Sequence, residues 1–422
     1  MGASSPALTG LPSLSDIDAA AERIRSATVR TPTVRSLLLE RELGSPLWMK
    51  MENLQVTASF KVRGALNKLL SLSQEERDAG VIACSAGNHA QGVAYHANRL
   101  SIPATIVMPS RTPFSKVTRT EALGAKVVLS GADLAESQDR ANELVAEHGY
   151  TFIHPYDDPL IIAGQGTIAR EIFEDAPEID TIVVPIGGGG LISGIAIAAR
   201  ALRPDIKIYG VEVALYPSMY ETVKGPAPDN SDRHVRGIQT LAEGIAVKRP
   251  GALTSEAVRE YVDDILIVGE SQIETAVQKL IEIQKVVAEG SGAAALAAVM
   301  SFSDLFKGRN TALLTCGGNI DSRLLASVLL RGLARDGRMA RIRVAITDQP
   351  GTLGHVGSIV GQAGGNIIDI VHQRLFHDMP VKSADLDIAV ETKSSEHIAE
   401  IMEALAAAGY PGRLLTELSN QG

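Results

Sequence analysis

Short apolar runs alternate with longer amphipathic stretches through the middle of this chain, between residues 80 and 320. The runs are rich in β-branched residues and occupy residues 81–84, 104–108, 126–129, 181–185, 207–213, 265–268 and 311–315. Helical periodicity fills much of the sequence between them, for example at 115–123, 133–147 and 273–287. Apolar strands separated by helices are typical of parallel sheets that are covered by helices, so the pattern predicts an α/β fold.

The pattern changes after residue 338. Strands are expected at 342–347, 366–374, 384–391 and around Leu414, with helices at 353–362 and 396–408. This βαββαβ order predicts a small ferredoxin-like domain. The charged stretch 331–338 is expected to link it to the larger part, which gives domains of 1–335 and 340–422. The turn formers at 225–234 indicate a surface loop.

Length and composition narrow the function classes. The 422 residues exceed what one hydrophobic core usually holds, and they carry a net charge of −9. An acidic chain does not favour nucleic acid or an anionic membrane as its main partner. No apolar run is long enough for a bilayer, and the first residues do not resemble a secretory signal. Two distant cysteines form no disulfide framework, so we expect a cytoplasmic enzyme with reduced thiols.

Three glycine-bearing motifs follow predicted strands directly. They are Ser85-Ala86-Gly87-Asn88-His89, Gly187-Gly188-Gly189-Gly190-Leu191 and Cys316-Gly317-Gly318-Asn319. In α/β sheets, ligands bind where loops leave the carboxyl ends of strands. The sequence therefore predicts one ligand site built from three distant segments.

The four consecutive glycines lie between a predicted strand and a predicted helix at 191–200. A flexible loop is the plain alternative. Backbone N–H groups in this place can bind a phosphate, with the helix dipole behind them. The loop lacks the Lys-Ser or Lys-Thr of a Walker A motif and the G-x-G-x-x-G spacing of a dinucleotide fold, so we expect a single phosphate.

Lys61 follows Ser59-Phe60 and precedes an amphipathic helix at 62–70. Most lysines are solvated surface groups, but this amine lies at a loop-to-helix junction beside an aromatic ring. Lysine forms Schiff bases with carbonyl compounds, and burial lowers its pKa into the working range. Together with the three glycine motifs, Lys61 indicates pyridoxal phosphate as cofactor.

The other two motifs have roles to match. Asn88 can donate its amide to the 3′-oxygen of the cofactor, and the Ser85 to His89 loop offers donors for a substrate carboxylate. His89 alone is more typical of a structural residue. Cys316 could be a small buried hydrophobe, or the neutral group that faces the pyridine nitrogen. A neutral partner makes the ring a weaker electron sink and favours β-elimination.

Longer segments around these motifs resemble the threonine dehydratase (threonine ammonia-lyase) family of fold-type II, tryptophan-synthase-β-like enzymes. They are Glu52-Asn53-Leu54-Gln55, Ser59-Phe60-Lys61-Val62-Arg63-Gly64-Ala65, Ser85 through Gly92 and Pro185 through Leu191. The resemblance covers most of residues 11–330 and implies a catalytic region of two parallel-sheet subdomains. It implies that Lys61 forms the Schiff base, that Phe60 and Asn88 contact the ring, that Gly187, Gly188, Gly189, Gly190 and Leu191 hold the phosphate, and that Cys316 faces the ring nitrogen. It also implies that Gln165, in Ala163-Gly164-Gln165-Gly166-Thr167, lies near the substrate.

The chain departs from the family at several positions. Ala58 stands where glycine is common, and Cys316 where serine is commoner. Ala86 stands where serine racemases have a serine that reprotonates the opposite face, which favours elimination over racemisation. Glu289, before Gly290-Ser291-Gly292, is either a buried carboxylate near the site or a helix-end charge. No metal ligand is assigned.

Residues 340–422 resemble an ACT domain, through Asp348-Gln349-Pro350-Gly351-Thr352-Leu353 and Gly364-Gly365-Asn366-Ile367. The resemblance implies an amino-acid effector and a homodimer or homotetramer; a dimerisation module without effector is the alternative. The whole chain is expected to convert L-threonine to 2-oxobutanoate and ammonia. L-serine or 3-hydroxyaspartate dehydration, and a catalytically weak amino-acid sensor, remain as alternatives.

Overall fold

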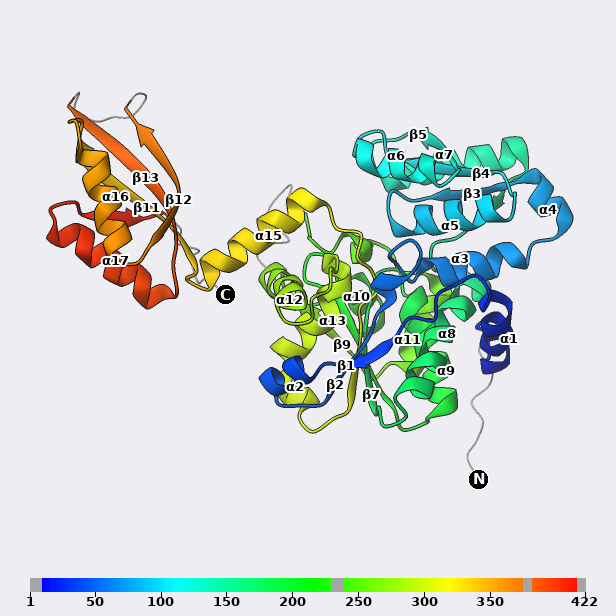
Figure 1. Cartoon of the computed structure of the whole chain (residues 1–422). Coiled ribbons are helices and arrows are strands. Elements are labelled where there is room, and N and C mark those ends of the chain that lie inside the picture. The colour runs from blue at the N-terminus through cyan, green and yellow to red at the C-terminus, as the bar shows by residue number, and fades with distance from the viewer. Residues whose placement is uncertain (1–9, 229–238, 375–381, 416–422) are drawn as a thin grey trace. The chain divides into compact units, whose positions relative to one another are not determined.

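The computed structural model describes residues 10–228, 239–374 and 382–415. The chain forms two compact units, Met1–Ile320 and Asp321–Gly422 (Figure 1). Each is described below by itself.

The first unit contains a six-stranded sheet with the order β1-β2-β10-β7-β8-β9. Its strands are β1 (Thr33–Arg35), β2 (Leu47–Lys50), β10 (Thr311–Leu314), β7 (Thr181–Pro185), β8 (Lys207–Val213) and β9 (Asp264–Val268). Only β1 runs antiparallel to its neighbour; the other pairs are parallel. Every residue of β2, β7 and β10 is buried, as expected for strands covered on both faces.

A second, fully parallel sheet has the order β5-β4-β3-β6. It consists of β5 (Lys126–Leu129), β4 (Ala104–Met108), β3 (Val81–Cys84) and β6 (Thr151–Phe152), and packs with helices that include α5 (Asn88–Arg99) and α7 (Leu134–His148). The predicted α/β fold with two parallel sheets is confirmed. Five predicted strands, 81–84, 104–108, 126–129, 181–185 and 207–213, have the observed bounds.

Three helices of the first unit pack through glycines: α3 (Lys61–Leu70), α8 (Pro159–Asp175) and α9 (Gly190–Leu202). A Cβ atom on Gly164 would lie 2.6 Å from the Cα of Gly64. A Cβ atom on Gly194 would lie 2.2 Å from the carbonyl oxygen of Ile162. Real Cβ atoms do not approach that closely, so only glycine permits this helix spacing. Helix α3 begins at Lys61 and α9 begins in the glycine loop, two parts of the predicted ligand site.

The remaining helices of the first unit complete its surface and core. They are α1 (Leu14–Ile24), α2 (Leu37–Leu43), α4 (Gln74–Ala79), α6 (Phe114–Ala122), α10 (Ser218–Lys224), α11 (Ala252–Tyr261), α12 (Glu270–Glu282), α13 (Gly290–Ser301) and α14 (Ser303–Phe306). The helix expected at 273–287 ends earlier, at Glu282, because Lys285 has a φ of 59°, which no right-handed helix accommodates.

The second unit has an antiparallel sheet with the order β12-β13-β11-β14. Its elements are α15 (Ser322–Arg335), β11 (Met339–Thr347), α16 (Thr352–Gln362), β12 (Asn366–Gln373), β13 (Ser383–Glu391), α17 (Ser395–Ala407) and β14 (Gly412–Leu414). Alternate residues of β11 are buried, because one face of the sheet carries α16 and α17. The predicted ferredoxin-like order is present in the described part of this unit.

Two sequence expectations for connecting segments come out differently. Helix α15 continues to Arg335 and occupies the first half of the stretch 331–338 that was expected to be a linker. Its leucines give it helical amphipathicity, and Asp321 caps its first turn by accepting from the N–H groups of Arg323 and Leu324. Most of the loop expected at 225–234 lies outside the described residues.

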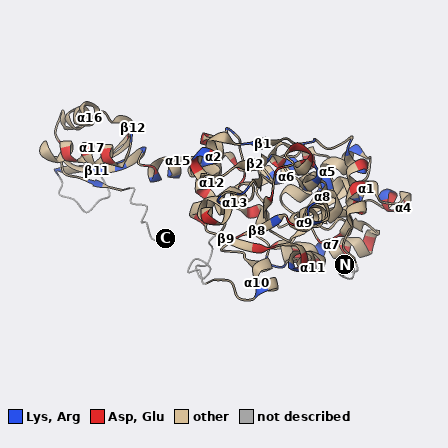
Figure 2. Ribbon diagram, turned by 90° about the horizontal axis from the view of Figure 1, so that it is seen from below, with Lys and Arg blue, Asp and Glu red and all other residues tan. Residues whose placement is uncertain are grey.

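Basic and acidic residues are interspersed along the ribbon of each unit (Figure 2). In the part of the chain that the structure describes, we find no helix that is long and apolar enough to cross a bilayer.

Candidate functional site

Lys61 is the first residue of α3, directly after Phe60. Its Nζ donates a hydrogen bond to the carbonyl oxygen of Pro155 at 2.7 Å and lies 5.2 Å from the centroid of the Phe60 ring. Burial lowers the pKa of Lys61 to about 8, and the nearby Cys316 opposes that shift. The site therefore contains an amine that is easily deprotonated and whose hydrogen-bond acceptor is a neutral carbonyl.

The segment from His154 to Tyr156, after β6, joins the lysine to the glycine loop. Pro155 accepts from the lysine, and the ring of Tyr156 packs so tightly on Gly188 that a Cβ there would lie 2.2 Å from its Cδ1. His154 accepts the N–H of Asp157 at Nδ1, and burial lowers the pKa of His154. Sequence reasoning missed this segment because β6 has only two residues, although its place after a strand was the usable signal.

The glycine loop lies between β7 and α9 as predicted. Gly189 has a φ of 95°, and a Cβ on it would lie 2.6 Å from Met219. The hydroxyl of Thr254 donates to the carbonyl oxygen of Gly188 at 2.7 Å and fixes the turn. The first N–H groups of a helix have no acceptor within it, so the start of α9 suits an anion. Leu191 packs into the main hydrophobic core.

Asn88 begins α5, and its side-chain amide has a partner at each end. Its Nδ2 donates to Oε1 of Glu289 at 2.7 Å, and its Oδ1 accepts from Nδ2 of Asn319 at 2.8 Å. Glu289 combines the two interpretations that the sequence left open, because it contacts Asn88 and is also the N-cap residue of α13. Asn319 is the last residue of the predicted Cys316-Gly317-Gly318-Asn319 motif.

The rest of the Ser85 to His89 loop leads into α5. Ser85 accepts the N–H of Gly87 at 3.2 Å, and Ala86 packs partly against the core of the small sheet. A Cβ on Gly87 would meet nothing within 4 Å, so the backbone there is open to a ligand. His89 lies 2.9 Å from the carbonyl oxygen of Ile153, and burial lowers its pKa to about 3, which keeps the ring neutral.

Cys316 follows β10 and is buried beside the start of α3, where the N–H of Phe60 donates to its carbonyl oxygen at 3.2 Å. Its thiol donates to the carbonyl oxygen of Ser291 at 3.4 Å. Burial raises the pKa of Cys316, so the group is a neutral thiol. Cys84 is buried in a different cluster, beside the β5-β4-β3-β6 sheet.

Gln165 lies inside the contact between α3 and α8. It is 1% exposed, and its Oε1 accepts the N–H of Gly64 at 3.3 Å. In this position it fixes the helix that begins with Lys61. Its expected contact with substrate stays a prediction.

These groups suit pyridoxal phosphate. The amine of Lys61 can bond to an aldehyde. A Cβ atom at 188, 189 or 190 would collide with Tyr156, Met219 or Thr254, so this loop has to stay bare backbone, whose N–H groups can bind a phosphate. The neutral Cys316 thiol matches a pyridine nitrogen that receives no charged partner. Within the described ranges, no group of three or more His, Cys, Asp or Glu side chains is arranged to hold a metal ion.

Comparison with known proteins agrees with this interpretation. The L-threonine ammonia-lyase of Thermotoga maritima is 43% identical over 402 residues, which are 95% of this chain and 99% of the relative. A solved threonine deaminase from T.th. superposes with a TM-score of 0.68 at 40% identity and covers 74% of this chain and 99% of its own. Maize serine racemase gives a TM-score of 0.70 at 34% identity, and the match covers 77% of this chain and 98% of the racemase. Residues 24–317 match the family described as pyridoxal-phosphate dependent enzyme, and this chain belongs to that family.

Proposed function

We propose that this chain converts L-threonine to 2-oxobutanoate and ammonia. The observation that carries the proposal is the Lys61 amine, deprotonated near pH 8 and positioned by Pro155 and Tyr156 beside a glycine loop suited to phosphate. Pyridoxal phosphate, when bound, supplies the electron withdrawal that makes the substrate Cα–H bond acidic. The similarity to the T. maritima enzyme over 95% of the chain supports threonine as substrate.

Lys61 serves first to anchor the cofactor and then to take the proton from Cα. Both tasks need the neutral amine. With a pKa of about 8, roughly one amine in ten is neutral at pH 7, compared with fewer than about one in a thousand for an ordinary lysine near 10.4. The environment that desolvates Lys61 thus prepares it for proton transfer.

The other residues bind and orient. The backbone of the loop at Gly188 and Gly189 would hold the phosphate, and the open backbone at Gly87, with the hydroxyl of Ser85, would hold the substrate carboxylate. Cys316 would face the ring nitrogen without adding charge. These assignments are predictions from the motifs, and the geometry described above supports them.

Ala86 favours elimination over racemisation. A racemase needs a proton donor on the second face of the substrate, and a methyl side chain cannot provide one. The fold is equally similar to that of maize serine racemase, so the distinction rests on this position rather than on architecture. We expect no D-threonine or D-serine to accumulate during turnover.

A substrate panel tests the proposal. The holoenzyme is given L-threonine, L-serine and 3-hydroxyaspartate, and the release of each 2-oxoacid is measured. We expect the highest kcat/KM with threonine. A higher value with serine or 3-hydroxyaspartate would make the chain a dehydratase for that amino acid, and bound cofactor without turnover would leave an amino-acid sensor.

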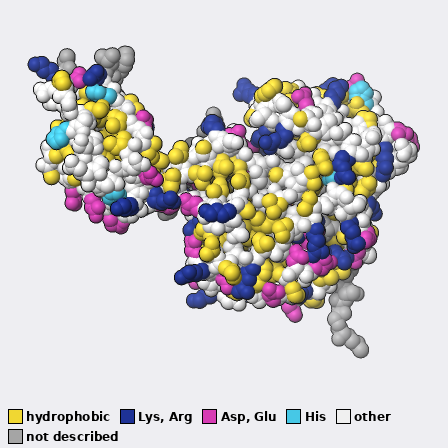
Figure 3. Space-filling view, in the orientation of Figure 1, with side chains coloured by type: hydrophobic (Ala, Val, Ile, Leu, Met, Phe, Trp, Pro, Cys, Tyr) yellow, Lys and Arg dark blue, Asp and Glu magenta, His cyan; other side chains and the backbone are white. Residues whose placement is uncertain are grey.

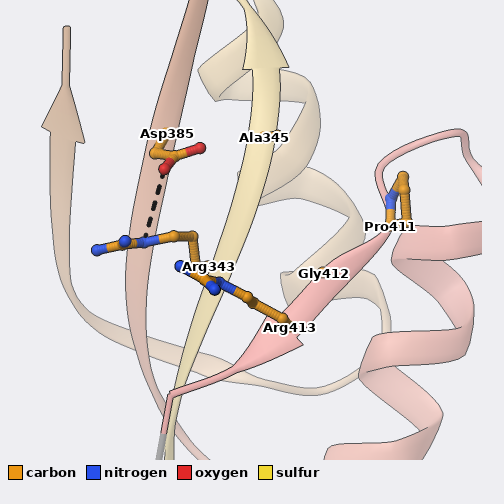
Figure 4. Close-up of a pocket in the computed structure, with 6 residues that line it drawn as sticks. All are labelled: Arg343, Ala345, Asp385, Pro411, Gly412 and Arg413. Atoms are coloured by element: carbon orange, nitrogen blue, oxygen red, sulfur yellow. Dashed lines mark ion pairs between the residues drawn. The ribbon is translucent and has the colours of Figure 1, made fainter. Parts of the chain in front are cut away.

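We also propose that the second unit binds an amino-acid effector, with isoleucine or valine favoured by the family resemblance. Support comes from the ferredoxin-like strand order and from a cavity of about 250 Å³ on the sheet. Arg343, Asp385 and Arg413 line this cavity, and Arg343 forms an ion pair with Asp385 (Figure 4). A zwitterion needs both charges, and the cavity has both.

Truncation tests the effector proposal. Because α15 belongs to the second unit, the cut falls after Ile320 rather than at the expected linker. The shortened enzyme should keep its activity and lose a response that typically corresponds to about 1–3 kcal/mol of coupling. A response that persists would locate the effector site in the first unit. A full-length enzyme without any response would leave the second unit as an assembly module.

We further propose a cytoplasmic homo-oligomer. Leu37, Leu38 and Phe114 are 66%, 61% and 81% exposed, and hydrophobic side chains gather on the visible face of the first unit (Figure 3). Apolar surface of this kind is commonly covered by association. Sedimentation equilibrium of the holoenzyme would show a dimer or tetramer if the proposal is correct.

A further inference from the structure

Asn88 is held by side chains from two other parts of the first unit. Glu289, at the start of α13, accepts from its Nδ2 at 2.7 Å. Asn319, after β10, donates to its Oδ1 at 2.8 Å and also to the carbonyl oxygen of Thr57 at 2.7 Å. Arg119, on α6, donates to Oδ1 of Asn319 at 3.2 Å. The amide of Asn88 is therefore fixed in orientation from both ends.

The hydrogen bonds to Glu289 and Asn319 leave one N–H of the Asn88 amide for a ligand. A side-chain amide has two N–H donors and a carbonyl with two lone pairs. One donor of Asn88 is used by Glu289, and one acceptor position is used by Asn319. Turning the amide over would bring its carbonyl against the Glu289 carboxylate and its NH₂ against the NH₂ of Asn319. Both contacts would be repulsive, so the free N–H keeps one direction.

Two neighbouring residues, Ser291 and Gly317, permit the hydrogen bond between Glu289 and Asn88. Its Oε1 also accepts from the hydroxyl of Ser291 at 2.7 Å. A Cβ atom on Gly317 would lie 2.4 Å from that same oxygen and 3.2 Å from Nδ2 of Asn88, so a glycine is required where the two side chains meet. The φ of Gly317 is not positive, which leaves the close approach as the reason for glycine.

We propose that Glu289 and Asn319 are positioning residues that clamp Asn88, so that its second N–H is presented to the phenolic oxygen of the cofactor. This inference rests on the proposed function, because it takes Asn88 as a cofactor-binding residue. Neither residue needs to touch substrate. A hydrogen bond to a charged acceptor is stronger than one between neutral groups, which suits a carboxylate as the clamp.

Several nearby groups influence the pKa of Glu289. Burial raises its pKa, while the hydrogen bonds from Ser291 and Asn88 oppose that shift. Glu243, on the short helix η3 (Glu243–Ile245), raises it further, and Lys116, on α6, lowers it. Cys316 interacts electrostatically with both Glu289 and Lys61, and its neutral thiol adds no charge of its own.

A double-mutant cycle with cofactor binding as readout tests the clamp. The wild type, Glu289→Ala, Asn88→Ala and the double variant are stripped of cofactor and titrated with pyridoxal phosphate, and the apparent Kd and the visible absorbance band are recorded. Loss of a charge-assisted hydrogen bond predicts a Kd roughly tenfold higher or more for Glu289→Ala, with a shifted band. In the Asn88→Ala background the same change should have little further effect.

Three further variants sharpen the result. Glu289→Gln keeps an acceptor oxygen without the charge and should lie between wild type and Glu289→Ala; it replaces the alanine variant in the cycle if that variant does not fold. Gly317→Ala should act like Glu289→Ala, because the methyl group separates the two side chains. Glu243→Gln removes a nearby negative charge without touching Asn88 and should leave the Kd unchanged.

Equal losses from Glu289→Ala with and without Asn88 would overturn the proposal, as would an unchanged Kd and absorbance band in the Glu289→Ala variant. A wild-type chain that bound no pyridoxal phosphate would instead overturn the proposed function.

Discussion

Two buried cationic groups stand within two residues of each other on α3, and their surroundings differ. Arg63 donates two hydrogen bonds to Glu52 and two to Glu171, and Lys50 donates to Glu171 at 2.6 Å. Two cationic and two acidic groups balance in this cluster. Lys61, by contrast, donates to the neutral carbonyl oxygen of Pro155.

The difference decides the protonation state of each group. Burial lowers the pKa of Arg63, but the ion pairs and hydrogen bonds with Glu52 and Glu171 raise it by more, so the pKa of Arg63 is raised overall. At Lys61 burial is the main influence, and the pKa falls to about 8. One helix thus carries a permanently charged side chain that holds structure and an amine that can react.

The largest effect should come from removing the reactive amine. Lys61→Ala should abolish both 2-oxoacid release and the visible absorbance of the bound cofactor, because anchor and base are lost together. The loss should exceed the factor of roughly 10²–10⁴ that a single general base provides. Circular dichroism serves as the folding control. A variant with ordinary turnover would contradict the role of Lys61.

Removing Arg63 from its cluster with Glu52 and Glu171 should lower the stability of the fold rather than act on the reaction itself. Arg63→Ala leaves Glu52 and Glu171 without their main partner, and breaking a buried pair typically costs about 3–5 kcal/mol. The measurement is urea unfolding of the cofactor-free chain. Arg35→Ala is the matched control, since Arg35 pairs with Glu40 at the surface and its loss should change stability little. Similar costs for both variants would show that burial of the cluster does not matter.

A carboxylate placed next to Lys61 should favour its charged form, as Glu52 and Glu171 favour the charged form of Arg63. Cys316→Asp should raise the pKa of Lys61 above about 8, because Cys316 already interacts with it electrostatically. It should also keep the ring nitrogen protonated and increase racemisation or transamination. Cys316→Ser, which stays neutral, should behave like the wild type. Identical product spectra for the Asp and Ser variants would mean that position 316 does not face the nitrogen.

The smallest effect is a pH dependence of the cofactor-free chain. The rate of cofactor attachment should rise with pH through about 8 and then level off, since the neutral amine is the reactive form. Between pH 8 and about 10.4 the unfolded chain binds more protons at this lysine than the folded chain does, so stability should rise with pH there. Lys61→Met should remove that contribution. A midpoint near 10 would show that the amine is not desolvated.

The sequence alone predicts those parts of the molecule that depend on local pattern. Strands such as β3 and β7 are continuous apolar runs, and continuous burial in a parallel sheet requires just that. Strand β2 was missed because it ends in Lys50, whose burial depends on Glu171 far along the chain. Nothing near residue 50 indicates that partner.

In the candidate site, too, local sequence pattern indicates individual residues but not their distant partners. The sequence marked Lys61 by its place at a loop-to-helix junction beside Phe60, and Asn88 and Cys316 by the glycines and strand ends next to them. The side chains of Lys61 and Asn88 form hydrogen bonds with residues more than 90 positions away in the sequence, Pro155 and Asn319. A single sequence carries no record of such pairs, so the connecting residues appear only in the folded chain.

The glycine contacts between α3, α8 and α9 have a consequence for how this enzyme can vary. Where backbones touch directly, no layer of side chains lies between them to be repacked. The distance from the lysine at the start of α3 to the glycine turn at the start of α9, which we propose binds the phosphate, is therefore set by main-chain atoms. Substitutions can accumulate over the outer faces of these helices without changing that distance, whereas a single added methyl group at Gly64, Gly164 or Gly194 would move the two ends of the cofactor site apart.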